Sequence, residues 1–135
     1  MQLNGEQRFK LPIWWFIYPT LLAIWSTVFG AWPLFDGDAA FAAFGLDVSA
    51  DTFIYQLYGA RYLSIAFALW LGLWIFRTPA AILTAWLARI VTDAIDLIAG
   101  LSSGAISGAG AFQSVIMFLG PELILLGLFY YYKGR

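Results

Sequence analysis

Four long apolar stretches, separated by short polar segments, dominate the pattern of this chain. They cover residues 11–32, 53–76, 80–101 and 111–132. A helix needs about 20 such residues to cross the apolar core of a bilayer. A single helix satisfies its own backbone polar groups there, because its hydrogen bonds close within the segment. The pattern therefore predicts an all-α fold, a single integral membrane four-helix bundle over residues 1–135.

The composition favours the same class. Apolar residues make up 62% of the chain and charged residues 11%, whereas a soluble domain has about 45–50% and about 25%. A water-soluble core of this size could not enclose that surplus. Arg8 and Lys10 precede the first stretch, as in a signal peptide, but the stretch is too long and aromatic and lacks a small-residue cleavage site. We therefore expect it to remain as a span.

The cations outside the spans predict the orientation, because Lys and Arg resist translocation. They are Arg8, Lys10, Arg77, Lys133 and Arg135, and all fall on one side of a four-span topology. The loops over residues 33–52 and 102–110 contain neither Lys nor Arg. Both termini are thus predicted to be cytoplasmic (N-in/C-in), in a multi-pass protein of a cell inner (plasma) membrane.

Two loops carry a pattern of their own. Residues 39–46 read AAFAAFGL, which predicts a short helix in the outer interface, with a lid over the bundle as the alternative. Gly100, Gly104 and Gly108 recur every four residues. This spacing is compatible with a flexible turn or with a close-packing extension of the third span.

Five ionisable residues inside the spans form the candidate site. They are Arg61, Arg89, Asp93, Asp96 and Glu122. On insertion scales, Arg or Asp at the centre of a span costs about 2.5–3.5 kcal/mol, so such residues pair with one another and face protein or water. Helical spacing places the three from the third span on one stripe. We expect Arg61 to reach Asp96 and Asp93, and Arg89 to reach Glu122, either in a functional pocket or as ion pairs that fix helix register.

Polar residues near these charges are predicted to support the site. Those that share a helix with a charged member and lie near it are Tyr58, Ser64, Thr92, Ser114 and Pro121. Pro121 cannot donate an amide, which leaves the carbonyl of Met117 free to accept another bond. The first span carries no charge and places small residues on one face, so we assign it to packing; these residues are Thr20, Ala23, Thr27 and Gly30.

The charges do not balance. Two arginines face three carboxylates, and the excess negative charge is costly in a dry site. One carboxyl, Glu122 or Asp96, is therefore expected to be protonated or to hold an external cation.

Two residue types are missing, and this limits the chemistry. The chain has no Cys and no His. It therefore cannot offer disulfides, a thiolate nucleophile or imidazole ligands, so we expect no metal site and no cofactor held by its own ligands. A basic patch for nucleic acid is also absent.

The motifs FGL in the first loop, YGARYLSIAFAL in the second span and ARIVTDAIDL in the third resemble the small bacterial DoxX-like membrane proteins and the uncharacterised four-helix families near them. The residues that match are Arg61, Arg89 and Asp93. The resemblance implies an accessory subunit of a quinone-linked respiratory or oxidoreductase assembly.

Three functions remain open. The first is a non-catalytic accessory subunit or assembly factor of a membrane complex, with a membrane-protein partner or a second copy of the chain. The second is a pocket that binds a quinone, a lipid or a small anionic amphiphile through the buried Arg, Asp and Glu residues, with possible proton coupling. The third, which the absence of His and Cys disfavours, is an acid–base enzyme on a lipid substrate that uses Asp93, Asp96 or Glu122.

Overall fold

The computed structural model describes residues 11–43, 52–104 and 106–133, and these residues form helices and turns without any strand. In the first half of the chain the elements are η1 (Ile13–Phe16, a 3-10 turn), α1 (Ile17–Phe35), α2 (Gly37–Ala43), α3 (Thr52–Trp70) and η2 (Leu71–Phe76, a π-helical turn). In the second half they are α4 (Pro79–Ser102), α5 (Gly108–Ser114), η3 (Val115–Leu119, also π-helical) and α6 (Gly120–Lys133). The predicted all-α class is confirmed for the described residues.

Three helical segments are long and apolar enough to cross a membrane. They are Ile13–Phe35, Gln56–Phe76 and Gly108–Lys133. The remaining long helix, α4, has 24 residues, and it differs from these three segments in carrying three charged residues, Arg89, Asp93 and Asp96.

The first two spans are joined through α2, and the element boundaries have local causes. α1 continues to Phe35, past the predicted end at Trp32, with Pro33 inside its last turns. Proline near a helix end removes only one backbone hydrogen bond, so the chain stays helical there. The predicted short helix is present as α2, although residues 44–46 of its motif lie outside the described residues.

The turn between α3 and α4 is closed by Arg77 and Thr78. Arg77 has a left-handed backbone (φ 51°), and its N–H donates to the carbonyl of Gly72 over 3.2 Å, which terminates η2. Thr78 caps α4 by accepting from the N–H of Ala81, and Pro79 follows at the first helical position, where its missing N–H costs nothing.

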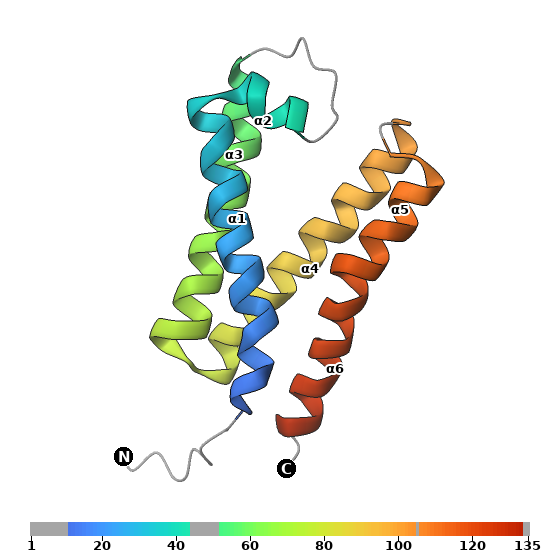
Figure 1. Ribbon diagram of the computed structural model, residues 1–135. Coiled ribbons are helices and arrows are strands. Elements are labelled where there is room, and N and C mark those ends of the chain that lie inside the picture. The colour runs from blue at the N-terminus through green and yellow to red at the C-terminus, as the bar shows by residue number, and fades with distance from the viewer. Residues whose placement is uncertain (1–10, 44–51, 105, 134–135) are drawn as a thin grey trace.

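The long helices form two antiparallel pairs (Figure 1). α1 lies beside α3, and α4 lies beside α5 and α6. The pairs converge where α1 begins and α6 ends, and they diverge toward α2 and the turn between α4 and α5. The first turn of α1 and the last turn of α6 therefore lie at the same end of the molecule.

Aromatic and aliphatic side chains fill the converging end. The core there includes Trp15, Leu69, Leu73, Trp86 and Phe129. Each of these is at most 1% exposed, so the two helix pairs share one apolar core at this end.

Glycine allows α1 and α3 to approach closely at the diverging end. A Cβ on Gly59 would lie 2.6 Å from the carbonyl oxygen of Gly30, and a Cβ on Gly30 would lie 2.7 Å from the backbone nitrogen of Leu63. Both positions therefore require glycine, and the predicted packing role of Gly30 agrees with this contact.

Residues 103 and 104 form a turn after α4. α4 ends at Ser102, and Gly104 has φ 73°. A Cβ on Gly104 or Gly108 would have no atom within 4 Å. The close-packing extension of α4 is therefore wrong, and the simpler alternative, a turn, holds.

Candidate functional site

Arg89 lies at the centre of the candidate site, on the side of α4 that faces the other helices. Its side chain is 3% exposed. The guanidinium donates from Nε to Oε1 of Glu122 (3.3 Å), from Nη1 to Oγ of Ser26 (3.1 Å) and from Nη2 to Oδ2 of Asp93 (2.7 Å). One buried cation thus connects α1, α4 and α6.

Asp93 and Glu122 share one edge of this guanidinium. The N–H bonds of Nε and Nη2 point in parallel, and in many proteins they donate to the two oxygens of a single carboxylate. Here each donates to an oxygen of a different carboxyl group. Two carboxyl groups held this close repel one another when both are ionised.

Glu122 is the most enclosed charged residue of the cluster. It is 0% exposed, and its Oε2 atom has no hydrogen-bond partner among the described residues. Its backbone carbonyl accepts from the indole N–H of Trp86 over 3.1 Å. The helix is therefore held at this position while one carboxyl oxygen remains unsatisfied, which is costly for an ionised group.

A second ion pair lies further along α4. Nη2 of Arg61 is 2.6 Å from each oxygen of Asp96, and the hydroxyl of Tyr62 donates to Oδ2 over 2.9 Å. This pair is more accessible, with side chains 44% and 28% exposed for Arg61 and Asp96. The structure places Asp93 with Arg89 rather than with Arg61.

Tyr62 connects the two ion pairs. Its ring lies 5.4 Å from the guanidinium carbon of Arg61 and 5.7 Å from that of Arg89. The ring of Tyr58 lies against it at an interplanar angle of 36°, with 4.8 Å between centroids. Sequence reasoning selected Tyr58 and missed Tyr62, although the two are four residues apart and share a helix face.

The assignment of α1 to packing alone needs correction. Its threonines do pack against α3 and η2, where Thr27 accepts from the indole of Trp70 and Thr20 from that of Trp74. Ser26, however, is 0% exposed and accepts from Arg89. A single serine in an apolar span carries no periodic signal, so only its partner shows its role.

Pro121 acts through the carbonyl of Met117. The hydroxyl of Tyr18 in α1 donates to this oxygen over 2.7 Å. The π-helical turn η3 ends at Leu119, two residues before Pro121, and Pro121 cannot donate the amide hydrogen bond that another residue would make in the helix. The released carbonyl thus accepts a hydrogen bond from a different helix, and this bond connects α1 to the helical segment formed by α5, η3 and α6.

The remaining supporting residues bond within their own helices. The hydroxyls of Ser64, Thr92 and Ser114 donate to carbonyls of their own helices, at Ala60, Ala88 and Gly110 respectively. Ser114 lines the cavity described next, whereas Ser64 and Thr92 do not.

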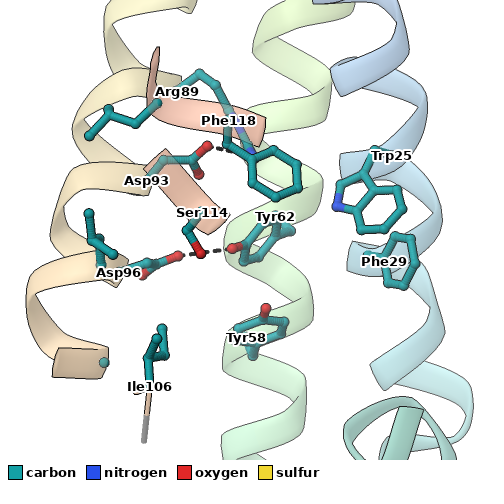
Figure 2. A pocket seen from close by; sticks show the side chains of 13 residues that line it. Trp25, Phe29, Tyr58, Tyr62, Arg89, Asp93, Asp96, Ile106, Ser114 and Phe118 are labelled. Atoms are coloured by element: carbon teal, nitrogen blue, oxygen red, sulfur yellow. Dashed lines mark hydrogen bonds and ion pairs between the residues drawn. The ribbon is translucent and has the colours of Figure 1, made fainter. Parts of the chain in front are cut away.

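A cavity of about 500 Å³ lies between the two helix pairs, beside these charges. Figure 2 shows Arg89, Asp93 and Asp96 on the α4 side, with Tyr58 and Tyr62 of α3 facing them. Trp25 and Phe29 from α1 complete the aromatic side. The remaining lining residues are Leu97, Gly100, Ile106, Ser114, Phe118 and Leu119. This size is typical of sites for small organic ligands.

The excess negative charge can now be located. Arg61 and Asp96 balance one another, whereas Arg89 faces both Asp93 and Glu122. If one carboxyl is neutral, the contacts therefore favour a member of the Arg89 cluster over Asp96. Within the described residues, no group of three or more His, Cys, Asp or Glu side chains is arranged to hold a metal ion.

The comparisons with known proteins returned no similarity: no family model matches the chain, and neither a curated protein nor a solved structure matches it.

Proposed function

We propose that the chain is a four-span protein of a bacterial inner membrane, with both termini in the cytoplasm and α4 as the fourth span. The length of α4, 24 residues, is sufficient for a bilayer. Its charges also have partners on neighbouring helices, because Arg89 binds Ser26 and Glu122, and Asp96 binds Arg61. α1 begins at the same end of the molecule at which α6 ends, as expected for an even number of membrane crossings.

Cysteine labelling tests this topology, because the chain has no native cysteine. A cysteine at position 80, in the first turn of α4, should react only from the cytoplasmic side. A cysteine at position 103, in the α4–α5 turn, should react only from the opposite side. Labelling of both positions from the same side would exclude α4 as a span.

We propose further that this protein binds a small amphiphilic molecule inside the membrane. The observation that carries the proposal is the cavity itself, which combines charged groups on one side with aromatic rings on the other. Apolar cavities with a few convergent polar groups are the usual form of ligand sites. A quinone or a lipid fits this division, since its head could bond to the polar side and its apolar part could contact the rings.

The exposure of the charged residues disfavours acid–base catalysis. Glu122 is 0% exposed, so a substrate in the cavity would not touch its carboxyl group directly. Asp96 is held by Arg61 and Tyr62, and Asp93 accepts from Arg89. We therefore propose binding without chemical conversion.

Native mass spectrometry of the purified protein tests binding. Ser114→Phe would fill the cavity, and it would break only a hydrogen bond within its own helix. Ile116→Phe is the matched control, because Ile116 is 56% exposed and does not line the cavity. We expect a lipid or quinone to be retained by the parent protein and by Ile116→Phe, and to be lost from Ser114→Phe. Equal retention in all three would contradict a ligand in this cavity.

A second candidate function is an accessory subunit of a membrane complex, and the exposure of Arg61 favours it. The Arg61 side chain is 44% exposed although its partner is Asp96 in α4. A partly bare guanidinium in a span is costly against lipid tails, so a membrane-protein partner or a second copy of the chain could cover it. The resemblance to DoxX-like proteins supports the same proposal. Native mass spectrometry of the same sample distinguishes the two candidates, because a partner adds a polypeptide mass and a ligand adds a small one.

A further inference from the structure

The polar side of the cavity offers mainly acidic groups. The side chains of Asp93 and Asp96 are 10% and 28% exposed, whereas that of Arg89 is 3% exposed. Three guanidinium N–H groups of Arg89 are already bonded, to Glu122, Ser26 and Asp93. Arg61, which pairs with Asp96, does not line the cavity. Among the charged residues that do, a ligand would therefore meet the carboxylates of Asp93 and Asp96 before the guanidinium of Arg89, which disfavours an anionic headgroup.

The opposite side of the cavity is aromatic. It contains Trp25 and Phe29 from α1 and Tyr58 and Tyr62 from α3. The faces of such rings carry negative potential and attract cations, and rings that surround a site are a common means of binding organic ammonium groups. Tyr62 already makes this contact with Arg61 and Arg89. The rings and the carboxylates thus favour the same kind of ligand.

The charge of the surrounding groups points the same way. Arg89, Asp93 and Glu122 sum to one negative charge when all are ionised, and Arg61 with Asp96 sums to zero. The titratable groups that surround Glu122 are Arg89 and Asp93 from α4 and Tyr18 from α1. In this enclosed position the excess charge needs one compensating positive charge, either a proton or a cation in the cavity.

We infer that the cavity takes a monovalent organic cation with an apolar body, which replaces one proton held by Asp93 and Glu122. The inference rests on the proposed function and names the ligand class for the same cavity. On binding, the O–H bond of the protonated carboxyl breaks, its electron pair remains on oxygen, and the proton leaves to water. The total charge of the site is then the same before and after the exchange.

Two ions of the same shape and opposite charge test the sign of the ligand. Tetraphenylphosphonium and tetraphenylborate differ in their central atom, so their size and apolar surface are closely matched. Binding of each radiolabelled ion is measured on the purified protein in detergent, and the signal of Ser114→Phe is subtracted to remove partitioning into micelles. We expect saturable binding of one tetraphenylphosphonium per chain and no saturable binding of tetraphenylborate.

The pH dependence tests the exchange. If one proton leaves for each cation that binds, the Kd for tetraphenylphosphonium should fall about tenfold for each unit by which the pH is raised. Glu122→Gln should weaken binding by about tenfold or more, because one negative charge is removed, and it should abolish the pH dependence. Asp38→Asn is the control, since Asp38 is an exposed carboxylate in α2 away from the cavity, and it should leave both properties unchanged.

The outcomes separate this inference from the proposed function. Saturable binding of tetraphenylborate in preference to the phosphonium would overturn the cation inference and leave an amphiphile site standing. Binding of neither ion would also overturn it, while a lipid or quinone lost only in Ser114→Phe would still support the proposed function. Phosphonium binding that is insensitive to pH and to Glu122→Gln would refute the proton exchange.

Discussion

Replacement of Arg89 by methionine is expected to cost more stability than the removal of all three charges of its cluster. Methionine keeps most of the length of the side chain but leaves Asp93 and Glu122 without their shared cation. Loss of one partner from a buried ion pair typically costs about 3–5 kcal/mol. The variant can instead take up protons, and protonation of an ordinary carboxyl at pH 7 costs about 4 kcal/mol.

The cost of a lost ion-pair partner and the cost of one protonation agree only if Arg89→Met forces a single carboxyl group to become neutral. Arg89→Met should then cost about 4 kcal/mol when Glu122 is already neutral, and about twice as much when both carboxyls begin ionised. The triple variant Arg89→Met/Asp93→Asn/Glu122→Gln contains no buried charge in this cluster. Its cost should be about 1–3 kcal/mol, from the hydrogen bonds that Arg89 made to Ser26 and the two carboxyls.

Unfolding by SDS in mixed micelles measures these differences, and the seven tryptophans of the chain supply the fluorescence signal. Arg77→Met is the matched control, because Arg77 is exposed and contacts the ring of Trp74 at a turn; we expect a cost below about 1 kcal/mol. A triple variant that is as unstable as Arg89→Met, or less stable, would refute the reasoning from unpaired charge.

Three further predictions concern the same helices. As the pH rises through neutrality, the free energy of unfolding of the parent protein should fall by about 1.4 kcal/mol per pH unit, because the folded state keeps a proton that the unfolded state releases. In Glu122→Gln the free energy of unfolding should not change with pH, and an equally steep slope there would contradict a proton on Glu122. Gly59→Ala should cost about 1–3 kcal/mol, because its Cβ would meet the backbone of α1, whereas Gly127→Ala, with open space around it, should be neutral or slightly stabilising in the same unfolding assay. Tyr18→Phe should lower the free energy of unfolding by about 1 kcal/mol. The loss should be smaller in a Pro121→Ala background, where the amide of residue 121 can bond to the carbonyl of Met117. Equal losses in the two backgrounds of a thermal-melt cycle would show that the two residues are not coupled.

The sequence was sufficient for the features that depend on local patterns. Apolar stretches of 20 or more residues identified each long helix, because the requirement to satisfy backbone polar groups leaves few alternatives to a helix in such a segment. The stripe of Arg89 and Asp93 followed from helical spacing. The effect of Pro121 on the carbonyl of Met117 followed from the chemistry of proline.

Other features depended on contacts between residues that are far apart in the chain. The donor to the Met117 carbonyl, Tyr18, is 99 residues away, and Ser26 is 63 residues from Arg89. Neither residue stands out within its own span. Periodicity shows which face of a helix a residue occupies, but it does not show which helix lies opposite.

The sequence by itself determined the long helices, the ionisable residues that they carry and the imbalance of their charges, because each depends on residue type and on spacing within one segment. Only the tertiary structure decided that Asp93 and Glu122 share Arg89 while Arg61 and Asp96 form a separate pair. It also decided that the helix pairs diverge and leave a cavity between them at that level. The physical reason is that the energy of a buried charge depends on its nearest partners, and the packing of whole helices brings those partners together.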